Sequence, residues 1–102
     1  MIALSAYDSV RAWMGASGFG EDDERIAVLE AFCAEHDTTP DEMIDQCLRR
    51  FDDGQLKLRM KARREWVGRI DAFEASGGRA QANILRSFFV QNGIPIQPTI
   101  TW

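Results

Sequence analysis

Apolar residues recur at intervals of three and four along most of the chain, which is the spacing of helices that bury one face. The clearest example is the segment 79–91, in which Ile84, Leu85, Phe88 and Phe89 share one helical face. Turn and cap residues separate it from four other segments with the same periodicity. The predicted helices cover residues 7–14, 21–36, 39–51, 55–74 and 79–91. We therefore expect an all-α fold, a small bundle of four to five short helices.

The sharpest helix boundary in the sequence is the segment 39–42, Thr-Pro-Asp-Glu. The side chain of Thr39 can accept a hydrogen bond at the start of a helix, and Glu42 lies three residues later, as in a capping box. Pro40 suits the first helical position because its missing N–H would have no partner there. Residues 52–54, Asp-Asp-Gly, are expected to end this third helix.

The apolar faces of these helices are expected to form one core. Its predicted members are Trp13, Ile26, Leu29, Phe32, Ile44, Leu48, Trp66, Ile70, Ile84, Phe88 and Phe89. The helical domain is expected to cover residues 1–93 and to end at Asn92 and Gly93. Residues 94–102 contain two prolines among alternating apolar residues, which predicts an extended linker or tail. Because this tail ends on Ile100 and Trp102, we expect that the natural chain continues or that the tail docks on a partner.

The composition is that of one soluble domain. Of 102 residues, 45% are hydrophobic and 27% are charged, and no apolar run approaches the length of about 20 residues that a membrane span needs. The first residues lack the pattern of a secretory signal, so the cytoplasm is the expected compartment. Cys33 and Cys47 lie within helical apolar patterns, which favours buried thiols over a disulfide.

Charge is distributed very unevenly along the chain. The net charge is −4, but residues 1–48 have two basic and eleven acidic residues, whereas residues 49–102 have ten basic and five acidic ones. These halves carry −9 and +5. Such asymmetry indicates a polyanionic partner for the second half, although the two halves could also face each other across the fold.

Polar residues form two stripes on the predicted helices of the second half. Arginine and lysine bind phosphates, and arginine and asparagine also read base edges, so both stripes are candidate DNA-binding surfaces. An ordinary solvated helix face explains the same pattern equally well. The candidate residues are Arg79, Asn83 and Arg86 in the segment 79–91, and Lys57, Lys61 and Arg64 in the segment 55–74.

The sequence does not favour catalysis or metal binding. Cleavage of a phosphodiester by a tyrosine nucleophile needs that tyrosine beside arginine and histidine, but Tyr7 and His36 are the only residues of their kinds and lie in the acidic half. The spacing of Cys33, His36 and Cys47 fits no four-ligand zinc pattern. Four further carboxylates fit helix caps and turns better than a calcium loop: Asp22, Asp23, Asp52 and Asp53. We therefore expect a non-enzymatic protein without cofactor or metal.

Three stretches of the chain resemble the core-binding domain of phage-type tyrosine recombinases, or integrases, particularly the archaeal ones. They are residues 9–13 (SVRAW) with 29–33 (LEAFC), residues 39–44 (TPDEMI), and residues 84–96 (ILRSFFVQNGIPI). The second is similar to the family's "TPDELI" turn, and the third to its "IRSFF" helix and "NGIPL" exit. The chain departs from the family where Gly20 to Asp23 replace the usual "S-x-x-T" opening of the second helix. Residues 52–64 have no clear counterpart.

The resemblance implies a SAM-like helical bundle that forms one arm of a clamp around the recombination site. In that family a separate C-terminal domain cleaves the strand, so double-stranded DNA and a catalytic domain or other recombinase subunits are the implied partners. The alternative is a helical protein-interaction module that self-associates through its oppositely charged halves. A further possibility is a regulatory remnant that competes with a full-length integrase for its site.

Overall fold

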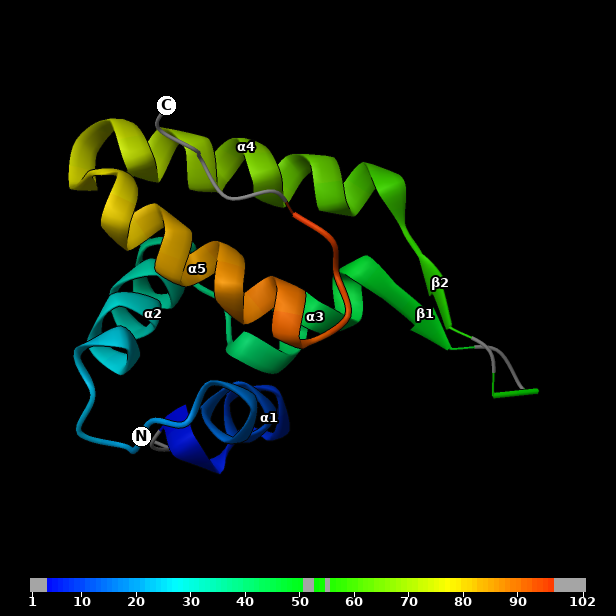
Figure 1. The fold of residues 1–102 in the computed structure, drawn as a ribbon. Helices are drawn as coiled ribbons and strands as arrows, with labels where there is room; N and C mark the ends of the chain where they lie inside the picture. The colour runs from blue at the N-terminus through cyan, green and yellow to red at the C-terminus, as the bar shows by residue number, and fades with distance from the viewer. Residues whose placement is uncertain (1–3, 51–52, 55, 97–102) are drawn as a thin grey trace.

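The computed structural model describes residues 4–50, 53, 54 and 56–96. After a short 3-10 helix (Leu4–Ala6) the elements are α1 (Asp8–Ser17), α2 (Glu24–Glu35), α3 (Pro40–Cys47), β1 (Leu48–Arg50), β2 (Leu56–Leu58), α4 (Met60–Gly77) and α5 (Arg79–Gln91) (Figure 1). The described chain is mostly helical, which confirms the predicted all-α bundle.

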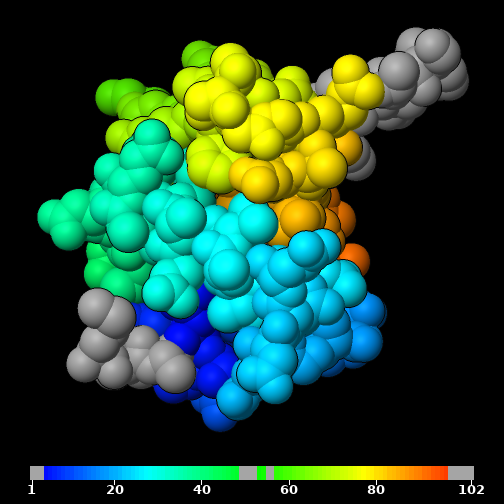
Figure 2. Space-filling view, turned by 90° about the vertical axis from the view of Figure 1, so that its left-hand side faces the viewer, coloured from blue at the N-terminus to red at the C-terminus, as the bar shows by residue number. Residues whose placement is uncertain are grey.

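Helices α4 and α5 form an antiparallel pair around which the rest of the chain is arranged (Figure 1). Gly78, with φ of 94°, is the only residue between them, and a side chain would be strained at this left-handed angle. Helix α5 also packs against α1 and α2, and α3 bridges α1 and α4. Figure 2 shows that α2 and the segment before it cover one side of the molecule.

The core lies between these helices and is rich in aromatic rings. Trp13 meets Phe88 edge-on at 5.4 Å between ring centroids, and Phe32 lies 5.9 Å from Trp66. Of the predicted core, the fully buried members are Trp13, Leu29, Phe32, Trp66, Ile70, Phe88 and Phe89, whereas Ile26, Ile44, Leu48 and Ile84 are only partly buried. Further buried hydrophobic residues, not named in that list of core members, are Val10, Cys33, Met43, Cys47, Ala82, Leu85, Ile94 and Ile96.

The β1–β2 hairpin corrects the prediction for the middle of the chain. The third helix ends at Cys47 rather than near Phe51, and the fourth begins at Met60 rather than near Gln55. Between them Leu48 pairs with Leu58, and Arg49 with Lys57, in antiparallel register. The turn includes Gly54 at φ of 86°. Asp53 and Gly54 therefore lie in the connection between two strands, a role for which such turn residues are equally suited.

The start of α3 agrees with the predicted cap. The Thr39 hydroxyl accepts a hydrogen bond from the backbone N–H of Glu42 at 3.2 Å, and Pro40 is the first helical residue. Helix α2 is capped in the same way by Asp23, which accepts from the N–H of Arg25. This bond, together with the Arg25 guanidinium, lowers the pKa of Asp23.

The packed domain continues beyond the predicted boundary at Gly93. Ile94 and Ile96 are buried, and the carbonyl oxygen of Pro95 accepts a hydrogen bond from Nε of Arg63 at 2.7 Å. The segment 94–96 is therefore part of the core rather than a linker. The rest of the predicted tail, residues 97–102, lies outside the described residues. Among the described helices, none is long and apolar enough to cross a membrane.

Both cysteines are buried free thiols, as predicted. Burial raises the pKa of Cys33 from 9.0 to about 12 and that of Cys47 from 9.0 to about 11. Because the thiolate is the reactive form, we expect the folded protein at pH 8 to react with a thiol reagent at least about 100-fold more slowly than the unfolded chain. Labelling with Ellman's reagent, with and without urea, measures both rates, and equal rates would contradict the burial.

Candidate nucleic-acid interface

Arg86, a predicted DNA contact, is buried and serves the fold. Its side chain is 3% exposed. One guanidinium nitrogen donates to Asp71 at 2.8 Å and the other to Glu74 at 3.0 Å and to Asn83 at 2.7 Å. A cation that is enclosed and paired with two carboxylates cannot also reach a phosphate. The prediction that Arg86 contacts DNA is therefore wrong, because acids on α4 face this position of α5.

The other two members of that stripe do not form a basic surface without it. Asn83 is half-buried and accepts the hydrogen bond from Arg86. Arg79 is exposed, but it begins α5 directly after the end of α4. At 1.5 Å per residue, α4 separates Arg79 from Lys61 by about 24 Å along the helix axis.

The second predicted stripe is exposed, although its members come from two elements. Lys57 lies on β2 rather than on a helix, while Lys61 and Arg64 lie near the start of α4. Arg59, which the sequence did not single out, is exposed between them. We call Lys57, Arg59, Lys61 and Arg64 the hairpin-end patch. In the part of the chain that the structure describes, the arginines and lysines that form ion pairs are Arg11, Arg25 and Arg86, so no acid pairs with this patch.

The acidic surface lies on another part of the molecule. Glu21, Asp22, Glu24, Glu30 and Glu35 are exposed on α2 and the turn before it. In Figure 1, α2 lies on the opposite side of the bundle from the β1–β2 hairpin. The acids of α2 are thus separated in space from the hairpin-end patch, whereas α3, which carries Asp41, Glu42 and Asp45, packs against α4.

The charges around the start of α4 oppose the usual preference of a helix. The positive end of the helix dipole favours acids, and α1, α2 and α3 each have an acid in the first turn. Helix α4 has none, and its N-cap residue, Arg59, makes no capping bond with its side chain. Arg59 and Lys61 therefore destabilise the helix slightly. Helix α5 shares this pattern, since it has no acid in its first turn and begins with Arg79, so the starts of both helices attract anions.

The hairpin-end patch borders a shallow hollow of about 460 Å³. Its lining comprises Gln46, Arg59, Met60, Lys61, Ala62 and Glu65. The side chain of Gln46 is fixed there, because its oxygen accepts a hydrogen bond from the Trp66 indole at 3.0 Å. Met60 is 52% exposed, so the surface between the cations is apolar.

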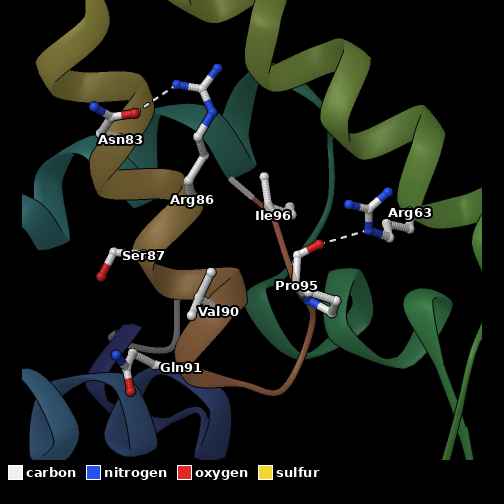
Figure 3. A pocket seen from close by; sticks show the side chains of 8 residues that line it. All are labelled: Arg63, Asn83, Arg86, Ser87, Val90, Gln91, Pro95 and Ile96. Atoms are coloured by element: carbon white, nitrogen blue, oxygen red, sulfur yellow. Dashed lines mark hydrogen bonds between the residues drawn. The ribbon is translucent and has the colours of Figure 1, made fainter. Parts of the chain in front are cut away.

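A larger groove of about 610 Å³ lies between α4, α5 and the segment 94–96 (Figure 3). Its lining residues are Arg63, Asn83, Arg86, Ser87, Val90, Gln91, Pro95 and Ile96. Val90 is 43% exposed, and with Met60 it is one of two large apolar side chains exposed among the described residues. No local sequence pattern predicts this groove, because the position of the segment 94–96 depends on the fold.

The residues considered for catalysis and metal binding lie elsewhere. The ring of His36 packs against Phe32 and Trp66, with centroids 4.6 and 5.7 Å away. Tyr7 is half-buried at the start of α1. Within the described ranges, no three side chains of His, Cys, Asp or Glu come together as metal ligands.

Comparison of the chain with known protein families, with curated proteins and with solved structures finds no match. The resemblance to integrase core-binding domains therefore stays a prediction that depends on the three stretches quoted above.

Proposed function

We propose that this chain is a non-catalytic DNA-binding module whose hairpin-end patch contacts the phosphate backbone of a duplex. The observation that supports the proposal best is the concentration around the start of α4 of exposed cations that form no ion pair with a described residue. Four such residues lie within eight positions, and the positive end of an 18-residue helix lies among them. Cations and a helix N-terminus both attract phosphate.

The shape of this region suits a duplex. The β1–β2 hairpin projects from the bundle at the end where α4 begins (Figure 1). A helix end and a neighbouring ribbon can grip the backbone on the two sides of one groove. The exposed Asp53 beside the turn disfavours deep insertion of the hairpin tip, so backbone contact by the flank that carries Lys57 is the preferred geometry. Such contacts give affinity without sequence specificity.

The finer proposal is an accessory arm of a site-specific recombinase. It draws on the resemblance to SAM-like core-binding domains, in which the helical bundle clamps the recombination site and another domain cleaves the strand. Strand cleavage would then depend on a catalytic domain or subunit outside residues 1–102. Duplex DNA and that catalytic partner are the proposed partners, and the cytoplasm is the proposed compartment.

A substitution at Arg59 tests the proposal, because it should change stability and binding in opposite directions. Arg59 has extended backbone angles, φ of −88° and ψ of 101°, which suit an N-cap. Arg59→Asp supplies a capping oxygen and a favourable charge, so we expect the free energy of unfolding to rise by about 1 kcal/mol. We expect DNA affinity to fall, because a phosphate contact is replaced by a repulsive charge. Urea unfolding and fluorescence anisotropy with a labelled duplex measure the two effects.

The matched control is Arg79→Asp, which makes the same charge change at the first residue of α5. It should reduce DNA affinity much less than Arg59→Asp. Equal losses of affinity would show that only the net charge matters. Unchanged affinity in Arg59→Asp would count against the hairpin-end patch.

A further inference from the structure

The groove between α4, α5 and the segment 94–96 has the features of a peptide-binding site. Its apolar wall is formed by Val90, Pro95 and Ile96, and its polar rim by Ser87 and Gln91 (Figure 3). Val90 is exposed, although most large apolar side chains of the described residues are not. An apolar surface with a few hydrogen-bonding groups at its edge is the usual composition of a binding groove.

Arg63 supplies a fixed positive charge at one side of this groove. Its Nε donates to the carbonyl oxygen of Pro95, so the guanidinium is held against the segment 94–96 while its other two nitrogens point away from Pro95 (Figure 3). A guanidinium held in this way binds a carboxylate well, because little side-chain entropy is lost on binding. Arg63 forms no ion pair with any described residue, unlike Arg86.

The charges and side chains of the lining define the ligand. No acidic side chain is among the described residues that line the groove, and Arg86 is already neutralised by Asp71 and Glu74, so the uncompensated charge of this described lining is that of Arg63. This charge fits an anion. The described part of the apolar wall is aliphatic and contains no aromatic ring on which a nucleobase could stack, which favours a peptide side chain over a nucleotide.

We propose that this groove binds a partner-protein segment in which an aliphatic or aromatic side chain lies next to a carboxylate. The apolar side chain packs on Val90 and Ile96, and the carboxylate accepts hydrogen bonds from the free nitrogens of Arg63. The site is distinct from the hairpin-end patch, so a single chain could hold DNA and a partner protein together.

A random peptide library displayed on phage tests this proposal with the full chain as target. We expect enriched peptides to contain Asp or Glu within two positions of a large apolar residue. A synthetic enriched peptide should lose at least about tenfold in affinity for Val90→Asp and for Arg63→Gln, because each removes one half of the recognition. Met60→Asp is the matched control, since it changes the other exposed apolar residue, and it should bind the peptide as the wild type does.

Three results would overturn the proposal. They are a library that yields no enriched peptide, an enriched peptide whose affinity Val90→Asp leaves unchanged, and duplex DNA binding that Val90→Asp abolishes. Loss of duplex binding in Val90→Asp would indicate that the groove binds nucleic acid rather than a peptide. The DNA proposal can fail independently of the peptide proposal, because Arg59→Asp tests DNA binding without changing a residue of the groove.

Discussion

In a variant with both Asp71→Asn and Glu74→Gln, the free energy of unfolding is expected to be about 3 kcal/mol lower than in the wild type. The reason is that Arg86 is 3% exposed, and these two carboxylates neutralise it. Removing both negative charges leaves a buried cation without compensation, which costs several kcal/mol in proteins. We place the loss at the lower end because Asp71 is itself 60% exposed and partly screened by water.

Arg86→Met is expected to be milder, at roughly 1 kcal/mol, although it removes the residue on which the network is centred. Methionine fills much of the same space, and the carboxylates of Asp71 and Glu74 can turn toward water. Urea unfolding of the double variant and of Arg86→Met gives the comparison. If Arg86→Met were the more damaging change, the buried arginine would be stabilised by something other than these two acids. DNA affinity should be the same in Arg86→Met as in the wild type.

The helices could be predicted from the sequence because their signals are local. The face formed by Ile84, Leu85, Phe88 and Phe89 and the cap at Thr39 each depend on residues within one or two turns. The hairpin could not be predicted in the same way. Leu48 and Phe51 fit the spacing of a helix, whereas Leu48–Arg50 is a strand because Leu56–Leu58 pairs with it. Such pairing is a tertiary contact that no local pattern reports.

Only part of the candidate site could be predicted from the sequence, because the rest also depends on how the helices pack against each other. A helical wheel correctly places Arg86 on the side away from Phe88, but it cannot show what another helix brings to that side. Asp71 and Glu74 lie on α4, and only the antiparallel packing on α5 makes them partners of Arg86. Lys57, Lys61 and Arg64 were predicted as a stripe on one helix and are exposed, although Lys57 lies on β2. Arg59 was missed because it belonged to the interior of a predicted helix.

The triple variant Lys57→Ala, Lys61→Ala and Arg64→Ala is expected to have the largest effect on DNA binding. Each phosphate contact adds about 0.9 to the slope of log affinity against log salt, since binding releases condensed counterions. Loss of three contacts should lower the magnitude of that slope by about 3 and weaken binding alike for different sequences. All three side chains are exposed, so the free energy of unfolding should change little.

The matched control removes three positive charges elsewhere, through Arg11→Ala, Arg69→Ala and Arg79→Ala. Its net charge equals that of the triple variant. A difference in salt slope between the two variants therefore depends on where the charges lie rather than on the total charge. The control should change the salt slope by less than about 1.

The direct test of the hairpin-end patch is therefore the salt dependence of duplex binding, measured by fluorescence anisotropy between about 50 and 200 mM salt for these three chains. We expect the wild type and the control to share a steep slope, and we expect the triple variant to lose it. Absence of duplex binding by the wild type at the lowest salt, or equal slopes in the triple variant and the wild type, would contradict it.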